Sequence, residues 1–132
     1  MKRNSVEFGI KVSDNAKQLV DLSSFIDTVN ELGIEALLQE GHAFGDSWVK
    51  QLYTGIKQGQ AVTVEGFYDD AEGGPDEVLN DVGATRQVET NWGGTKKSTF
   101  DAIITNYVRK PVRGELTRFS CTLTPTGEIT EA

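Results

Sequence analysis

The sequence has 132 residues, of which 37% are hydrophobic and 25% are charged, an ordinary balance for one globular domain with a single core. Its formal net charge of −7 argues against a protein that grips nucleic acid through a basic surface, because Lys and Arg supply that affinity by displacing counterions. No apolar stretch approaches the roughly 20 residues of a membrane-crossing helix. We therefore expect a single domain over 1–132, with flexible ends at 1–5 and 127–132, that stays in the cytoplasm.

The first elements of the chain are predicted to form a β-hairpin. Residues 6–12 alternate apolar and polar side chains, and this period of two is typical of a half-buried strand. A polar turn at 13–17 leads into a second short strand at 19–22. A single helical turn through Phe25 and Ile26 is expected next, because Asp and Ser residues precede it and can cap its free amides.

The segment 27–41 fits two structures. Its composition favours a helix, and Val29, Leu32 and Ala36 recur at helical spacing. The even-numbered positions from 32 to 38 are also all apolar, and they alternate with Glu31, Gly33, Glu35 and Gln39, as in a half-buried strand. Local reasoning therefore leaves helix and strand open here.

A short amphipathic helix is predicted before Gly55. Its apolar side chains recur at spacings of three and four, an Asp or a Ser precedes them as a cap, and Gly55 can take the left-handed conformation that ends it. A polar turn at 57–60 then separates the helix from 61–68, where β-branched and aromatic residues alternate as in a strand. The residues that indicate the helix are Asp46, Ser47, Val49, Leu52 and Tyr53.

The clearest helix start in the chain follows a polar loop at 69–74. Pro75 suits the first helical position because the amide that it lacks would be unpaired there, and the two acids after it complement the helix dipole. Val78, Leu79 and Val82 form the expected buried stripe. We predict a helix of about two turns that covers one side of the sheets.

The rest of the chain is predicted to be β-structure. The strand at 99–108 has apolar residues on both faces, so we expect it to be central and covered on both sides. Cys121 alternates with apolar residues in the last long strand and is predicted to lie in the core, because free cysteine is among the most buried residue types. The expected segments are strands at 86–92, 99–108 and 115–124, a turn at 93–95, a basic connection at 109–114, and an edge strand at 128–131.

The side chains that carry chemistry do not form a recognisable site. His42 is the only histidine, which makes a zinc set or a Ser-His-Asp triad difficult to build. The acids between 69 and 77 lack the ordered spacing of a calcium loop, and nothing selects a catalytic pair among the 20 acidic residues. Trp48 and Trp92 can stack on a sugar or a base, although a core or subunit contact is the simpler interpretation. We predict no enzyme activity, no metal and no cofactor.

The order and spacing of several short motifs resemble the major tail tube protein of long-tailed, siphovirus-type bacteriophages, over essentially the whole chain. The central block is the most similar part, and both flanks agree with it. The motifs are Val20-Asp21-Leu22-Ser23 with Phe25-Ile26, Phe44-Gly45-Asp46, Tyr53, Gly55-Ile56-Lys57, Val64-x-Gly66-Phe67-Tyr68-Asp69-Asp70, Phe100-x-Ala102-Ile103-Ile104-Thr105-x-Tyr107, Phe119-Ser120-x-Thr122 and Thr126-Gly127.

The resemblance implies a fold and an assembly. The fold is mainly β, a β-sandwich or partly open barrel of two packed sheets, with one short flanking α-helix and minor helical turns, and 27–41 becomes a long strand. Six copies form a ring, and rings stack into the hollow tail tube of the virion, through which DNA is ejected. The implied partners are the tape-measure protein, the tail terminator and the baseplate or tip proteins. DNA passes through without specific binding, no membrane is involved, and assembly takes place in the host cytoplasm.

Two sets of residues are candidates for this role. Acids on the polar faces of the long strands are hypothesised to line the lumen and repel phosphate, and charged loops are hypothesised to join subunits or rings. The lumen candidates are Glu31, Glu35, Glu65 and Asp101, and the contact candidates are Asp69, Asp70, Glu72, Arg109, Lys110 and Arg113.

Three other functions remain open from the sequence. One is a non-enzymatic β-sandwich binding module, for example for carbohydrate, and another is a small hydrolase with an unrecognised carboxylate pair. The third is the tube protein of a related contractile tail or secretion system, which shares the architecture.

Overall fold

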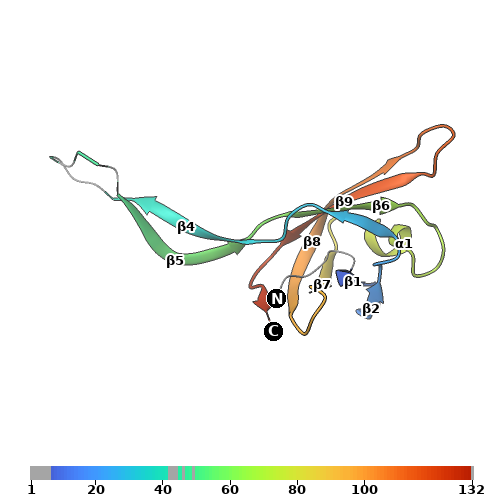
Figure 1. The fold of residues 1–132 in the computed structure, drawn as a ribbon, viewed down its shortest axis with the longest axis horizontal. Helices are drawn as coiled ribbons and strands as arrows, with labels where there is room; N and C mark the ends of the chain where they lie inside the picture. Colours follow the sequence, from blue (N-terminus) through green and yellow to red (C-terminus); the bar gives the residue numbers. More distant parts are fainter. Residues whose placement is uncertain (1–6, 42–44, 46, 49, 132) are drawn as a thin grey trace.

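The structure is a computed structural model that describes residues 7–41, 45, 47–48 and 50–131. A body of strands carries a long two-stranded arm that projects from one side (Figure 1). The elements in chain order are β1 (Gly9–Ser13), β2 (Leu19–Asp21), β3 (Ile26–Val29), β4 (Ile34–Glu40), β5 (Gln51–Gly59), β6 (Val62–Phe67), α1 (Pro75–Leu79), β7 (Thr85–Asn91), β8 (Lys97–Lys110), β9 (Arg118–Pro125) and β10 (Thr130–Glu131).

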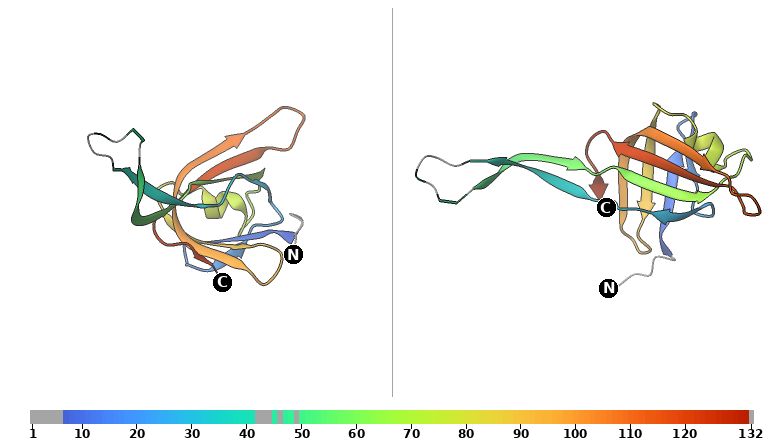
Figure 2. Two further views of the ribbon diagram at one scale, coloured as in Figure 1. Left: turned by 60° about the vertical axis from the view of Figure 1, so that its left-hand side comes forward. Right: turned by 90° about the horizontal axis from the view of Figure 1, so that it is seen from above.

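One antiparallel sheet of eight strands forms the body. Seven strands follow the order β2-β1-β7-β8-β9-β6-β3, and β10 pairs with β8 beside them. The 14-residue strand β8 belongs to both halves, because its first part pairs with β7 and its later part with β9. A register shift between Ile104 and Asn106 marks the place where such a strand can bend. The sheet therefore curls into a partly open barrel whose two layers belong to one sheet (Figure 2).

The core lies between the two halves of this sheet. It is built from the inward positions that the period of two predicted, and its members include Ile10, Val64, Phe119 and Leu123, each at most 2% exposed. Cys121 is fully buried among them, and burial raises the pKa of its thiol to about 12. The predictions of a mainly β fold and of a core cysteine are confirmed.

The helix α1 begins where the sequence predicted but is shorter. Val78 and Leu79 are buried, whereas Val82 is 58% exposed, so the prediction that Val82 joins the buried stripe is wrong. The helix ends at Leu79, and the Arg86 Nε atom donates to the Val78 carbonyl at 3.3 Å. Because the buried guanidinium of Arg86 occupies this end of the helix, the chain turns away toward β7 instead of making a second turn.

The predicted helix before Gly55 is wrong. Leu52, Tyr53 and Gly55 lie in strand β5, which also includes most of the predicted polar turn at 57–60. Ser47 lies in a bend, and Asp46 and Val49 are outside the described residues, as is His42. Pairing with β4 gives hydrogen-bond partners to the backbone groups of β5 that face it, and this tertiary contact overrides the local helical spacing.

Four further expectations are resolved by the structure. The segment 27–41 is a strand as predicted, but it is divided into β3 and β4 by residues 30–33. The predicted helical turn exists as a bond from the Ile26 amide to the Leu22 carbonyl at 3.1 Å, after which Ile26 starts β3. Strand β8 is central as predicted, but its outer face is open, since Ile103 is 36% exposed. The edge strand predicted near the C-terminus is present as β10.

Candidate functional site

The arm is made of β4 and β5 and continues two strands of the body. The Asn30 amide donates to the Thr63 carbonyl at 2.8 Å, and the Gln60 amide donates to the Gly33 carbonyl at 3.0 Å. These bonds carry the β3–β6 pairing of the body across into the β4–β5 pairing of the arm. The arm is therefore a ribbon anchored in the sheet rather than a loose loop (Figures 1 and 2).

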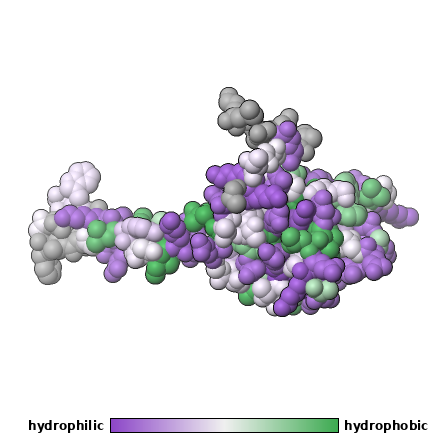
Figure 3. Space-filling model, turned by 90° about the horizontal axis from the view of Figure 1, so that it is seen from below, coloured by the Kyte–Doolittle hydropathy of each residue, from purple (hydrophilic) through white to green (hydrophobic). Residues whose placement is uncertain are grey.

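Large apolar side chains are exposed along the arm. Leu38 and Tyr53 lie directly opposite each other and are 57% and 53% exposed. Ile34, Leu52 and Ile56 add exposed fractions of 48%, 57% and 57%. Apolar surface accordingly recurs along the arm in the space-filling view (Figure 3). A two-stranded hairpin without a covering layer is at best marginally stable in water, so this composition suits an arm that is covered by a partner.

An irregularity gives the arm a fixed shape. The register shifts between Ala36 and Leu38, and Gly55 in the opposite strand has a φ of 86°, which a residue with a side chain rarely adopts. The Thr54 hydroxyl donates to the Leu37 carbonyl at 2.9 Å across this irregularity. We infer that Gly55 serves a bulge within a strand, not the helix end that its position in the sequence suggested.

The root of the arm packs against the C-terminal part of the body. A methyl group added at Gly59 would lie 2.8 Å from a Pro125 side-chain atom and 2.9 Å from one of Ile129. Ile34 and Tyr53 line a groove together with these two body residues. The close approach at Gly59 fixes where the arm leaves the body.

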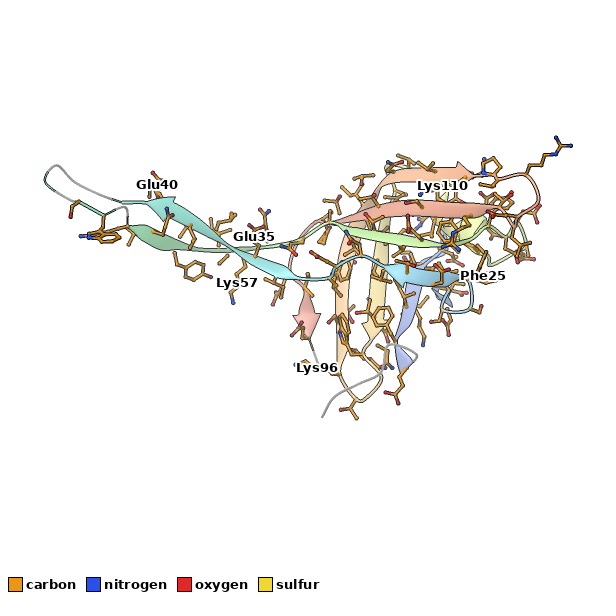
Figure 4. The ribbon with its side chains drawn as sticks, turned by 45° about the horizontal axis from the view of Figure 1, so that its top comes forward. Phe25, Glu35, Glu40, Lys57, Lys96 and Lys110 are labelled. Atoms are coloured by element: carbon orange, nitrogen blue, oxygen red, sulfur yellow. The ribbon has the colours of Figure 1, made fainter. Side chains whose placement is uncertain are left out.

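The four candidate lumen acids lie at separate places. Glu31 is exposed in the connection between β3 and β4, and Glu35 lies on the arm. Glu65 is on β6, where its carboxylate pairs with the Lys110 ammonium at 3.2 Å, and Asp101 is exposed on β8. Figure 4 places Glu35 on the arm and Lys110 at the opposite end of the body. The structure does not gather these acids into one stripe, and their role stays a prediction.

Among the candidate contact residues, Arg109 has its partners within its own chain. Its Nη2 atom lies 2.8 Å from the Asp76 carboxylate, and its guanidinium lies 5.6 Å from the ring of Tyr68 and 5.7 Å from that of Tyr107. The hydrogen bond to Asp76 raises the pKa of Arg109. The pKa of Tyr107 is raised mainly by burial, and the Asp76 carboxylate raises it further. Arg109 therefore ties the end of β8 to helix α1.

The other contact candidates surround this end of the body. Asp69 accepts a bond from the Ala71 amide at 2.8 Å and shapes the loop before α1. Asp70, Glu72 and Arg113 are in connections between the elements, and Arg113 is exposed. Loops 69–74 and 111–117 thus offer charges of both signs.

A polar surface that sequence reasoning missed covers the outside of β6, β9 and the later part of β8. We call it the hydroxyl face. The signal in the sequence is the alternation of Ser and Thr with apolar residues in the last long strand. It consists of Thr63, Thr105, Ser120, Thr122 and Thr124, with the ion pairs Glu65–Lys110 and Asp27–Arg118 beside them.

Groups for catalysis or metal binding are not assembled in the part of the chain that the structure describes. No cluster of three His, Cys, Asp or Glu side chains occurs there that could hold a metal ion. Within the same residues, no helix has the length and apolar character required to cross a membrane. The Trp92 ring packs 5.1 Å from the ring of Phe8, and its Nε1 atom donates to the Ser98 hydroxyl at 2.9 Å, whereas Trp48 is 82% exposed.

Comparisons with known proteins support the fold. No protein-family model and no curated protein matches the sequence. The structure is similar to a chain in the tail of an empty GTA particle, solved by helical refinement in C6 symmetry, with a TM-score of 0.81, 12% identity and 99% of each chain covered. A chain of the native gene transfer agent virion gives a TM-score of 0.78 at 12% identity, again over 99% of each chain. A chain of the six-fold symmetrised anti-feeding prophage baseplate gives 0.70 at 12% identity, with 95% of this chain and 91% of that chain covered.

Proposed function

We propose that this chain is the structural subunit of a tail tube in a phage-like particle, and that six copies form each ring of the tube. The observation that carries this proposal is the arm, which projects exposed apolar side chains such as Leu38 and Tyr53 from a fold shared with chains of six-fold symmetric tails. The proposed role is structural and non-enzymatic, and it requires no cofactor.

Burial of the arm against a neighbouring copy supplies energy for assembly. Full burial of a large apolar side chain contributes about 1.5–3 kcal/mol. The five apolar side chains named on the arm are each roughly half exposed in the isolated subunit. Covering them contributes about 5 kcal/mol per arm before the costs of association. Contact between the arm and a second copy therefore explains why the arm exposes apolar side chains, and it stabilises the two strands of the arm.

The edges of the body sheet suit lateral association. β2 and β3 are the two ends of the strand order, so each pairs with one neighbour among the described strands. Exposed edges of this kind invite pairing with another chain, and a closed ring satisfies them. Stacking of rings is a head-to-tail contact that does not close, which generates a filament. We assign this stacking to the loops that carry Asp69, Asp70, Glu72 and Arg113.

Size explains why several copies are needed. A folded chain of this length has a radius of gyration of roughly 14 Å. Duplex DNA is about 20 Å across, as its groove depths indicate. One copy cannot enclose such a duplex, whereas a ring leaves an open axis. We propose that DNA and a tape-measure protein occupy this axis in turn, and that terminator and baseplate or tip proteins bind the two ends of the tube. The finished tube belongs to the virion and is assembled in the host cytoplasm.

A second candidate function is a subunit of a contractile or secretion-type device, and the similarity to a baseplate chain of the anti-feeding prophage favours it. A subunit that forms only one ring in a baseplate does not need stacking surfaces on both sides of that ring. Filament length separates a tube subunit from a subunit that forms a single baseplate ring, whereas the tube subunit of a contractile device also gives filaments of many rings.

Substitution of one arm residue tests the proposal, with electron microscopy and sedimentation of the purified protein as the measurements. Leu38→Asn should raise the concentration needed for assembly about tenfold, since loss of about 1.4 kcal/mol per contact is a tenfold change. Val82→Asn is the matched control, because Val82 is 58% exposed on the body and Leu38 is 57% exposed on the arm. Both variants should keep the circular dichroism of the wild type. Equal assembly by the two variants would count against the arm as the contact.

A further inference from the structure

The hydroxyl face combines hydroxyl groups with paired charges, and such a surface suits the channel of the proposed tube. We propose that the hydroxyl face is the wall of the channel, and that it lets a polyanion pass because its charged groups are cancelled by partners within the wall. This inference rests on the proposed function. It differs from the prediction of an acidic wall, in which unpaired carboxylates repel phosphate.

Strand pairing places the hydroxyl groups on one surface. Residues directly opposite each other in an antiparallel pair share a face of the sheet, and Thr63 lies opposite Thr122. The hydroxyls of these two residues are 3.5 Å apart. Thr105 donates to the Thr122 carbonyl at 3.2 Å, and its hydroxyl is 3.3 Å from that of Thr124. The threonine hydroxyls are therefore held by their neighbours, and they offer no charge to a passing phosphate.

The charged groups of β3, β6, β9 and the end of β8 on this face have partners of opposite sign from another strand, whereas Asp101 is exposed further along β8, where β8 pairs with β7. Glu65 of β6 pairs with Lys110 of β8 at 3.2 Å. Asp27 of β3 pairs with Arg118 of β9 through two hydrogen bonds of 2.8 and 3.0 Å, and the guanidinium lies 4.8 Å from the Phe67 ring centre. Two acids and two bases cancel on this face, although the whole chain carries −7.

Neutrality has a physical consequence for transport. An unpaired Lys or Arg on the wall would bind phosphates by counterion release and hold the DNA in place. The opposite choice, a wall of unpaired acids, raises the cost of bringing a polyanion within the Debye length of about 8 Å. Paired charges and hydroxyls avoid both effects. Val108 lies opposite Ser120 and adds uncharged surface to the same face.

Two features of the fold favour this face over the outside of the β1–β7 half. The β3–β6 ribbon continues into the arm, so a contact between arms and neighbouring bodies joins the hydroxyl faces of successive copies. The last strand, β10, instead pairs with β8 at Thr99 and Ser98, in the part of β8 that pairs with β7. The described end of the chain thus lies away from the hydroxyl face and does not narrow a channel there.

Cysteine placement locates the wall in assembled tubes. Thr122→Cys introduces a thiol on the hydroxyl face, and Gln87→Cys introduces one at an exposed position on β7. The wild type is the blank, because its Cys121 is fully buried. Each protein is labelled with a biotin maleimide as tubes and then incubated with gold-conjugated streptavidin, which is too wide for a channel that fits one duplex.

We expect gold along the length of Gln87→Cys tubes, and on Thr122→Cys only after the tubes are taken apart. Gold along intact Thr122→Cys tubes would overturn the inference while leaving the tube itself established. Failure of the wild-type protein to form tubes or rings would instead contradict the proposed function.

A charge substitution tests neutrality separately. Thr122→Lys places an unpaired cation on the hydroxyl face, and Gln87→Lys adds the same charge on β7 as the control. Tubes assembled with a fluorescent single-stranded oligonucleotide are treated with nuclease and sedimented at low salt. We expect Thr122→Lys to retain at least tenfold more protected oligonucleotide than the wild type and Gln87→Lys to match the wild type. Equal retention by all three proteins would refute the role of charge cancellation.

Discussion

Substitution of Gly66 by alanine is expected to damage the end of the β3–β6 pairing that lies away from the arm. Gly66 lies opposite Ile26 in the β3–β6 pair, next to a register shift between Ile26 and Thr28. A methyl group added at Gly66 would overlap the Phe25 carbonyl and lie 2.8 Å from the Ile26 Cα atom. Both neighbours are backbone atoms, so no side chain can rotate away to make room.

The expected cost follows from this geometry. Overpacking costs about 1–3 kcal/mol, and the need to move backbone places Gly66→Ala near 3 kcal/mol. For a domain of this size that loss lowers the Tm by about 10 °C. The Tm is measured by circular dichroism at one low protein concentration, because assembly would otherwise raise it by mass action.

Gly127→Ala is the matched control for this measurement. A methyl group at Gly127 meets nothing within 4 Å, so its Tm should equal that of the wild type or rise slightly as the unfolded chain loses freedom. A Gly66→Ala protein that melts within about 2 °C of the wild type would refute the reasoning, since a drop on the order of 10 °C is expected.

Other predictions concern the core, an ion pair and a helix end. Cys121→Ser should lower the free energy of unfolding by about 1–3 kcal/mol in denaturant titrations, because it buries a hydroxyl on the apolar side of β9, and Cys121→Ala should show no such polar penalty. Hydrogen bonds from Arg118 lower the pKa of Asp27, so the stability they give is present above the unfolded pKa of about 4 and is lost as the pH falls through the folded value. Acid titration of Asp27→Asn should therefore show a weaker loss of stability below about pH 4 than the wild type shows. Arg86→Gln should cost about 3 kcal/mol by the same denaturant assay, since it leaves buried partners such as the Val78 carbonyl unpaired, and an unchanged midpoint would contradict this.

The site could be predicted only in part because charge and sequence do not reveal pairing. The sequence identifies Glu65 and Arg109 as charged and outward, and both predictions of their roles assumed that these charges were available to other molecules. The structure gives Glu65 a partner in Lys110 and gives Arg109 a partner in Asp76. The Asp76–Arg109 pair joins residues 33 positions apart, a separation that no local pattern indicates.

The sequence by itself determined most of the strands of the body and the start of α1. Alternation decides which side chains of a strand face the core, and Pro75 with its following acids defines a helix start, because both effects act over a few residues. Only the tertiary structure decided that the stretch before Gly55 is a strand of a projecting arm. There the local spacing favours a helix, and the choice of a strand is made by β4, whose backbone groups pair with those of β5. Hydrogen bonds between strands require a partner elsewhere in the chain, so they override local propensity without leaving a local signal.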